Sequence, residues 1–163
     1  MAGGASIYVC VGGAPLSYVD PHGLLRFHPW VKRQYPNTVN YINATRDRMT
    51  ATKYEGFSRA ADTGRKHLDE LLDPCAGPVV TPDRLKHDHG RYTNGSGELF
   101  VHRSYFDRFE AGDRSPELLD ILNRTIEHEL VHFSEYFWNR NRSTIEEGWR
   151  YENIVYGTPI PRN

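Results

Sequence analysis

The sequence is poor in the features that define several common protein classes. Its 163 residues include two cysteines, Cys10 and Cys75, too few for a disulfide scaffold or a zinc finger. No apolar run approaches the roughly 20 residues of a membrane span. The sequence also lacks a basic segment followed by an apolar one, so it does not predict a cleavable secretion signal. Lys and Arg total 20 against 21 Asp and Glu, without a block of one sign. Neither nucleic acid nor a membrane is therefore an expected partner, and any metal must be bound by His, Asp or Glu.

A motif of two histidines and a glutamate is the main chemical feature. The stretch EHELVH (127–132) contains His-Glu-x-x-His, with His128 and His132 four residues apart. On a helix such residues are neighbours, with Cβ atoms about 5–6 Å apart, so both imidazoles can bind one zinc ion. Glu129 lies about 100° further round the helix. There it can take a proton from a zinc-bound water and later give one to the leaving nitrogen. The motif predicts a zinc peptidase.

The residues around the motif predict that it lies on a helix. Ser115-Pro116-Glu117 is typical of a helix start, and apolar residues then recur at helical spacing. We expect one helix over 116–138, with the motif past its middle. Ser143-x-x-Glu146 has the form of a capping box, which predicts a last helix over 144–156.

The remaining segments predict a mixed fold. Residues 25–37 contain two prolines and predict a loop, whereas 38–50 and 56–73 favour helices. An NGSG turn predicts a hairpin, with GELFVHRSYF (97–106) as its best strand. Its segment 98–105 is expected to lie above the site helix and to pair with an extended substrate. The expected fold class is α+β, a minimal zincin-like fold in which a small antiparallel sheet or hairpin packs on the site helix beside further helices.

A catalytic zinc ion takes three protein ligands and keeps one position open. No histidine or methionine follows His132, which excludes the metzincin arrangement. The pattern HELVH…EEGWRYE resembles the HExxH…EGxxxY of gluzincin peptidases, in which the acid before the glycine is the third ligand. The resemblance implies Glu147, although the spacer of 14 residues (133–146) is shorter than in the aminopeptidases. Glu146 is the expected capping acid. Glu152 is the alternative ligand, because ENIVYG also resembles small bacterial toxin peptidases with a late acid, and an upstream ligand stays open.

The first 24 residues differ from the rest, being almost uncharged and rich in Gly, Ala and Tyr. IYVCVGGAPLSYVDPHGL (7–24) resembles the end of the Rhs repeat-associated core, whose DPxGL signature marks a self-cleavage point. The matching residues are Asp20, Pro21, Gly23 and Leu24, and Ala14 stands where the family usually has Asn. A plain strand-turn-strand is the alternative interpretation.

The Rhs resemblance implies a boundary in the chain. Residues 1–24 would be the end of the core and 25–163 the toxin domain, with cleavage between Leu24 and Leu25. Asp20 would belong to an aspartyl cleavage centre. Such chemistry needs two carboxyl groups with unequal pKa values, and the rest of the core is absent, so we expect inefficient self-processing.

Other chemistry-bearing residues have simpler interpretations. The histidines of KHDHG (86–90) are expected to be solvated in a polar loop. Tyr151 and Tyr156 have the chemistry to stabilise an oxyanion, but aromatic packing is the preferred interpretation of both. Trp138 and Trp149 are expected in the core.

Together these features predict a zinc-dependent metallopeptidase effector, an antibacterial toxin delivered into a target cell by an Rhs-type leader and a type VI secretion apparatus. Zn²⁺ is the expected cofactor, Glu129 the general base, and a protein or peptide the substrate. A cognate immunity protein is the expected partner in the producing cell. One alternative is an amidase of the same chemistry acting on cell-wall peptide. The other is a non-peptidase toxin, a nuclease or binding protein with a structural metal, although the absence of a basic patch counts against a nuclease.

Overall fold

The computed structural model describes residues 25–64, 68, 71, 77–139 and 146–161. The Rhs-like segment, with Asp20 and Leu24, lies outside the described residues. Leu25 is the first residue described, and its side chain is 2 % exposed within the hydrophobic core. The residue expected to follow the cleaved bond is therefore part of the folded domain.

A four-stranded mixed sheet forms one layer of the molecule. The strands lie in the order β1 (Arg26–Phe27), β2 (Val79–Asp83), β4 (Glu98–His102) and β3 (Gly90–Tyr92). β1, β2 and β4 run parallel, and β3 is antiparallel to β4. The predicted hairpin is thus present as β3–β4, with Gly95 and Gly97 at positive φ in the turn. Of the two expected forms, an antiparallel sheet or a hairpin, only the hairpin is antiparallel, because β2 pairs with β1 and β4 in parallel.

The predicted loop over 25–37 is wrong, because its two prolines begin helices instead of breaking the chain. α2 (Pro29–Gln34) and α3 (Pro36–Asn43) each start with proline in the first turn, where the missing N–H costs no helical hydrogen bond. A 3₁₀ turn η1 (Arg46–Arg48) follows. α4 (Ala51–Ala60) is capped by Thr50, whose hydroxyl accepts the Lys53 N–H at 3.3 Å.

The strand predicted over 97–106 is shorter than expected. β4 ends at His102, and α6 (Arg103–Glu110) begins directly after it. The His102 imidazole caps this helix by accepting the Ser104 N–H at 3.2 Å. A histidine cap is outside the usual Ser, Thr, Asp and Asn set, which explains why the sequence pattern did not reveal this helix start.

The predicted site helix is confirmed. α7 (Pro116–Ser134) is capped by Ser115 and continues into a π-helical turn, η2 (Glu135–Asn139). The last helix, α8 (Glu147–Tyr156), starts three residues later than predicted. Its cap is Glu146, whose Oε2 accepts the Trp149 N–H at 2.7 Å, while Ser143 lies outside the described residues.

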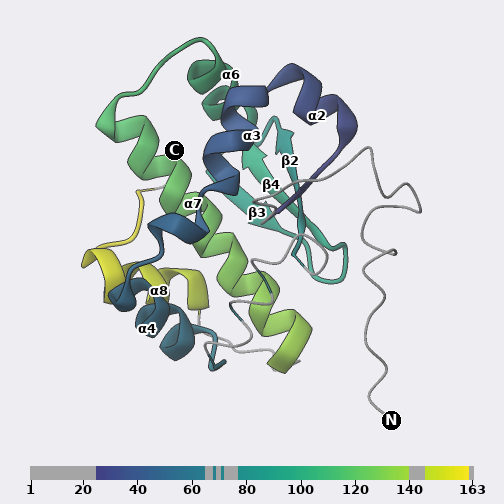
Figure 1. Cartoon of the computed structure of the whole chain (residues 1–163). Coiled ribbons are helices and arrows are strands. Elements are labelled where there is room, and N and C mark those ends of the chain that lie inside the picture. Colours follow the sequence, from purple (N-terminus) through teal and green to yellow (C-terminus); the bar gives the residue numbers. More distant parts are fainter. Residues whose placement is uncertain (1–24, 65–67, 69–70, 72–76, 140–145, 162–163) are drawn as a thin grey trace.

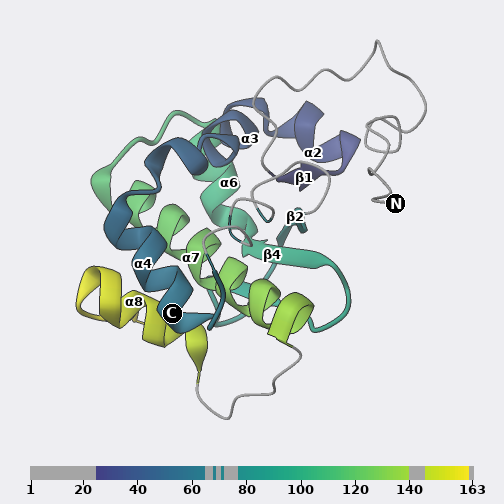
Figure 2. The ribbon, with the colours of Figure 1, turned by 60° about the horizontal axis from the view of Figure 1, so that its bottom comes forward.

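α7 lies at the centre of the molecule. The sheet packs on one side of it, whereas α4 and α8 lie together on the other side (Figures 1 and 2). Its buried face contributes Leu122, Ile126, Leu130 and Phe133 to the core. Within the described residues, no helix is long and apolar enough to cross a membrane. The histidine motif therefore lies on a helix that packs between the sheet and α8.

Candidate metal centre

His128 and His132 point in the same direction from α7. They occupy successive turns, and their Nε2 atoms lie 3.2 Å apart. Both side chains are mostly buried, with 13 % and 24 % of their surface exposed. This is the pairing that the four-residue spacing predicts, and it directs two nitrogen donors at one point.

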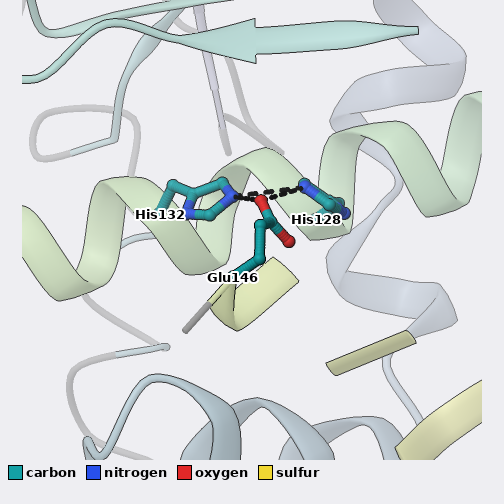
Figure 3. A group of neighbouring side chains, drawn as sticks. All are labelled: His128, His132 and Glu146. Carbon is teal, nitrogen blue, oxygen red and sulfur yellow. Dashed lines mark hydrogen bonds and ion pairs between the residues drawn. The ribbon is translucent and has the colours of Figure 1, made fainter. Parts of the chain in front are cut away.

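Glu146 brings a carboxylate to the same point. Its Oε1 lies 2.5 Å from His132 Nε2 and 3.2 Å from His128 Nε2, as Figure 3 shows. Its Oε2 caps α8 at the same time. Because the cap residue precedes the helix, its side chain turns back toward α7 instead of projecting from the surface of α8.

The structure therefore brings a different glutamate to the histidines from the one that the gluzincin resemblance implies. Glu147 is 5 % exposed and is absent from the group formed by His128, His132 and Glu146. Its Oε2 has no hydrogen-bond partner among the described residues and lies 3.7 Å from Arg150 Nη1. Glu146 is therefore more than the expected capping acid. One of its oxygens caps α8, and the other lies with the two histidines.

Gly148 permits the close packing of α8 on the histidines. A Cβ atom at this position would lie 2.3 Å from His128 Nε2. The absence of a side chain at Gly148 thus makes room for the imidazole ring of His128.

The donor set fits a divalent cation. Two imidazole nitrogens and one carboxylate oxygen lie within 4.8 Å of one another, and two histidines with one glutamate are a known ligand set for catalytic zinc. Burial lowers the pKa of His128, but its hydrogen bonds with Glu146 and Glu152 outweigh burial and raise the pKa to about 10. Burial opposes the charge of Glu146 too, yet the two histidines hold its pKa well below the usual range. The surroundings of His128, His132 and Glu146 thus favour a positive charge between these side chains.

Glu152, the alternative ligand in the sequence, lies behind His128. It is 2 % exposed, and its Oε1 is 2.6 Å from His128 Nδ1. Its Oε2 accepts Arg124 Nη2 at 3.1 Å and the Ile160 N–H. A carboxylate on Nδ1 orients the ring and leaves Nε2 to face a metal, which is the usual arrangement around a ligand histidine. Glu152 therefore acts on the site through His128.

Glu129 faces the sheet beside the cluster. It is 6 % exposed, and its carboxylate accepts the backbone N–H of Tyr92 in β3. Burial raises the pKa of Glu129, while the two histidines and the Tyr92 N–H act in the opposite direction. Gly90 lets β3 approach this closely, because a Cβ there would lie 2.8 Å from Glu129 Cγ.

These groups share one cavity of about 230 Å³ between β3, α7 and α8. Its lining residues are Asp88, His89, Gly90, Arg91, Tyr92, Thr125, His128, Glu129, His132, Glu146, Trp149, Glu152 and Ile160. Trp149 is 39 % exposed at this cavity, so its predicted place in the core is wrong. Trp138 has no described side chain.

Tyr151 and Tyr156 turn away from the cavity. Both hydroxyls donate to Glu127 Oε2, at 2.8 and 2.5 Å, and Lys53 Nζ lies 2.6 Å from the other oxygen of Glu127. The packing interpretation of the two tyrosines holds, with a polar network that the sequence pattern did not reveal. Neither hydroxyl is available to an oxyanion at the metal group.

The two histidines of KHDHG differ in their surroundings. His87 is exposed, as expected. His89 is half-buried and lines the cavity, where it hydrogen-bonds the Tyr105 hydroxyl through Nδ1 and the Pro161 carbonyl through Nε2 at 2.6 Å. The expectation of a solvated side chain is wrong for His89, because the chain folds two distant residues against it.

Comparison with known protein families adds an independent finding. The sequence model of a family described as metallopeptidase toxin 3 matches residues 31–157. That span contains both histidines, Glu129, Glu146 and Glu152. No curated protein and no solved structure matches the chain.

Proposed function

The chain belongs to the metallopeptidase toxin 3 family, and from this premise we propose that it is a zinc-dependent peptidase that cleaves proteins. The observation that carries the proposal is the meeting of His128, His132 and Glu146 in one cavity with the buried carboxyl group of Glu129. A membership in a toxin family supports damage to another cell as the purpose of the cleavage.

His128, His132 and Glu146 are the residues that would hold the ion. Zinc bound there would polarise a substrate carbonyl and lower the pKa of a water molecule. Two hydrogen bonds outside the donor group hold these side chains in place. Glu152 fixes the ring of His128, and the Trp149 N–H at the start of α8 fixes the carboxylate of Glu146.

Glu129 is the general base in this proposal. Burial raises the pKa of Glu129 above its ordinary value, which favours a group that first accepts a proton and then releases it. The N–H of Tyr92 holds the carboxylate at the cavity wall. Glu129 takes a proton from the attacking water and passes it to the nitrogen of the bond being cleaved.

β3 is the strand that supports substrate binding. The sequence suggested the segment 98–105 for this task, but both edges of β4 are paired, with β2 and β3. β3 stands at the end of the strand order and lines the cavity through Gly90–Tyr92. An extended substrate pairing with this edge would lie across the cavity beside Glu129.

The delivery route is also part of the proposal. The Rhs-like residues 1–24 support an Rhs-type leader and cleavage at Leu24–Leu25 with Asp20 taking part. A toxin of this kind also needs an immunity protein in the producing cell. Cleavage of cell-wall peptide by the same chemistry is the competing activity, and the substrate assay below separates the two.

The test combines metal content with cleavage of heat-denatured casein. The purified protein should contain zinc and cleave the casein, and His128→Ala should lose both. Glu129→Gln should keep its zinc and lose at least about 100-fold in rate, because general acid–base catalysis contributes that much. Full activity of Glu129→Gln would contradict the assigned role, and cleavage of cell-wall peptide without cleavage of casein would favour the amidase.

A further inference from the structure

His89 is a third histidine at the catalytic cavity, and neither the metal group nor the general base uses it. It lines the cavity together with His128 and Glu129. It immediately precedes Gly90, whose close approach to Glu129 brings this part of the chain beside the general base. The imidazole therefore lies in the same cavity as the proposed general base.

The partners of His89 decide which of its nitrogens carries a proton. Nε2 lies 2.6 Å from the carbonyl oxygen of Pro161, and a carbonyl oxygen can only accept a hydrogen bond. Nε2 is therefore the donor. In the neutral ring Nδ1 accepts from the hydroxyl of Tyr105, and Tyr105 is 4 % exposed in the core. A buried tyrosine thus holds the His89 ring in the form whose Nε2 is the donor, and the ring lines the cavity.

The carbonyl that His89 binds belongs to the C-terminal tail, Thr158–Pro161. This tail leaves α8 and turns back toward α7 (Figure 1), where Arg124 Nη2 donates to the Thr158 carbonyl. The Ile160 N–H donates to Glu152, and Ile160 itself lines the cavity. A short peptide segment thus lies at the cavity with its backbone hydrogen-bonded to three side chains.

We infer that His89 is a catalytic residue that donates a hydrogen bond to the carbonyl oxygen of a peptide substrate, and that the Pro161 carbonyl occupies this position in the absence of substrate. The inference rests on the proposed peptidase function. It adds a donor for the substrate carbonyl, and it makes the tail a segment that a substrate must displace.

The role of His89 follows from the charge changes in amide hydrolysis. The oxygen of water adds to the carbonyl carbon, one proton of that water passes through Glu129 to the nitrogen, and the carbon–nitrogen bond then breaks. The carbonyl oxygen gains negative charge when the water adds and loses it when the bond breaks. A fixed N–H on that oxygen stabilises the charged stage more than the starting amide. His89 keeps its proton throughout, so the atoms balance without it.

The first experiment compares His89→Ala with His87→Ala, an exposed histidine two residues away in the same loop. With casein as substrate, His89→Ala should lower kcat about 100-fold, the scale for the loss of one such donor, and leave zinc affinity within about twofold. His89→Gln, which keeps an N–H, should recover part of kcat. His87→Ala should match the unmodified protein. Equal kcat values for the two alanine variants, or a matching loss of zinc affinity in His89→Ala, would overturn the inference.

A second experiment tests the tail and does not depend on cleavage. Removal of residues 158–163 should lower KM, because the cavity is then open to substrate, whereas a loss of zinc affinity would make the tail a structural support. In the shortened Glu129→Gln protein with zinc, a synthetic peptide of residues 157–163 should shift the imidazole NMR signals of His89. No shift would overturn the inference even if no substrate were cleaved, while absent cleavage with a clear shift would count against the proposed function alone.

Discussion

The two carboxylate oxygens of Glu146 bind different partners, and this is what makes the third donor of the site hard to recognise. Oε2 accepts the backbone N–H of Trp149 at the start of α8, and Oε1 lies with the imidazoles of His128 and His132. A helix cap is normally valued for about 1 kcal/mol of stability. Here the cap also fixes a donor atom, so a substitution should affect metal binding more than folding.

The ligand assignment predicts a clear order among three glutamate variants. Glu146→Ala should lower zinc affinity most, by at least about 100-fold, because it removes a donor. Glu152→Ala should lower it by about 10- to 100-fold, the range for a group that orients a ligand. Glu147→Ala should have the smallest effect, because its carboxylate is outside the donor group.

Competition with a coloured chelator measures these three affinities. Arg150→Ala is a control, since Arg150 lies 3.7 Å from Glu147 and is not in the donor group. If Glu147→Ala were the variant that fails to bind zinc, the gluzincin assignment would return.

At the scale of single residues, the sequence predicted what local spacing determines. His128 and His132 are four apart on one helix, and Glu129 follows from the same geometry. The third donor depends on where α8 crosses α7, which no local pattern encodes. The same is true of His89, whose partners Tyr105 and Pro161 are distant in the chain.

The helices are joined by a buried charge network. Glu127 on α7 is 1 % exposed and accepts from Lys53 on α4 and from two tyrosines on α8. The network ties both helices to the element that carries the histidines. Since the Glu127 carboxylate is out of contact with water, its negative charge is stabilised by these partners, and losing one of them would destabilise the folded protein.

Lys53→Ala should therefore destabilise the protein strongly, by about 3 kcal/mol, because it leaves a buried carboxylate without its cation. The Lys53 side chain is only 14 % exposed, so screening by water is limited. Urea unfolding of the metal-free protein measures the change. Lys86→Ala, at an exposed position, should stay within about 0.5 kcal/mol, and equal losses in the two variants would contradict the role of the network.

At the scale of elements, the errors of sequence prediction have identifiable causes. Pro29 and Pro36 were interpreted as breakers, yet proline is also favoured in the first helical turn, and only the following contacts distinguish the two. β4 and α6 share one apolar stretch, and the change from strand to helix at His102 depends on an unusual cap. In α7, apolar residues recur at helical spacing over many residues, so the choice between strand and helix is clear and that helix was predicted.

The whole molecule should respond to pH differently with and without metal. In the metal-free protein the pKa of His128 is raised from 6.5 to about 10. A raised pKa in the folded state contributes stability that is complete below 6.5 and is lost as the pH rises toward 10. The lowered pKa of Glu146 contributes stability above its ordinary value of 4.5 and is lost as the pH falls below it.

The urea concentration at the unfolding midpoint, measured with a chelator present, should therefore decrease as the pH is raised from 6.5 to 9.5. With zinc the fall should be smaller or reversed, because protons no longer compete for the histidines. His128→Gln should lack most of the fall in the metal-free protein. A midpoint that is independent of pH in the metal-free protein would show that the histidine does not hold its proton this way.

The position of Glu146 between α8 and the histidines has a consequence for how easily the protein unfolds before and after it binds a metal ion. An ion bound at this junction connects the last helix to the centre of the fold, and a ligand that binds only the folded state adds about 4 kcal/mol at a thousandfold excess over its Kd. Before the metal is bound, the folded state lacks this contribution and the chain unfolds more easily. After it is acquired, refolding is favoured and unravelling is opposed. The supply of metal where the protein acts would then favour its folded state, in addition to enabling the chemistry.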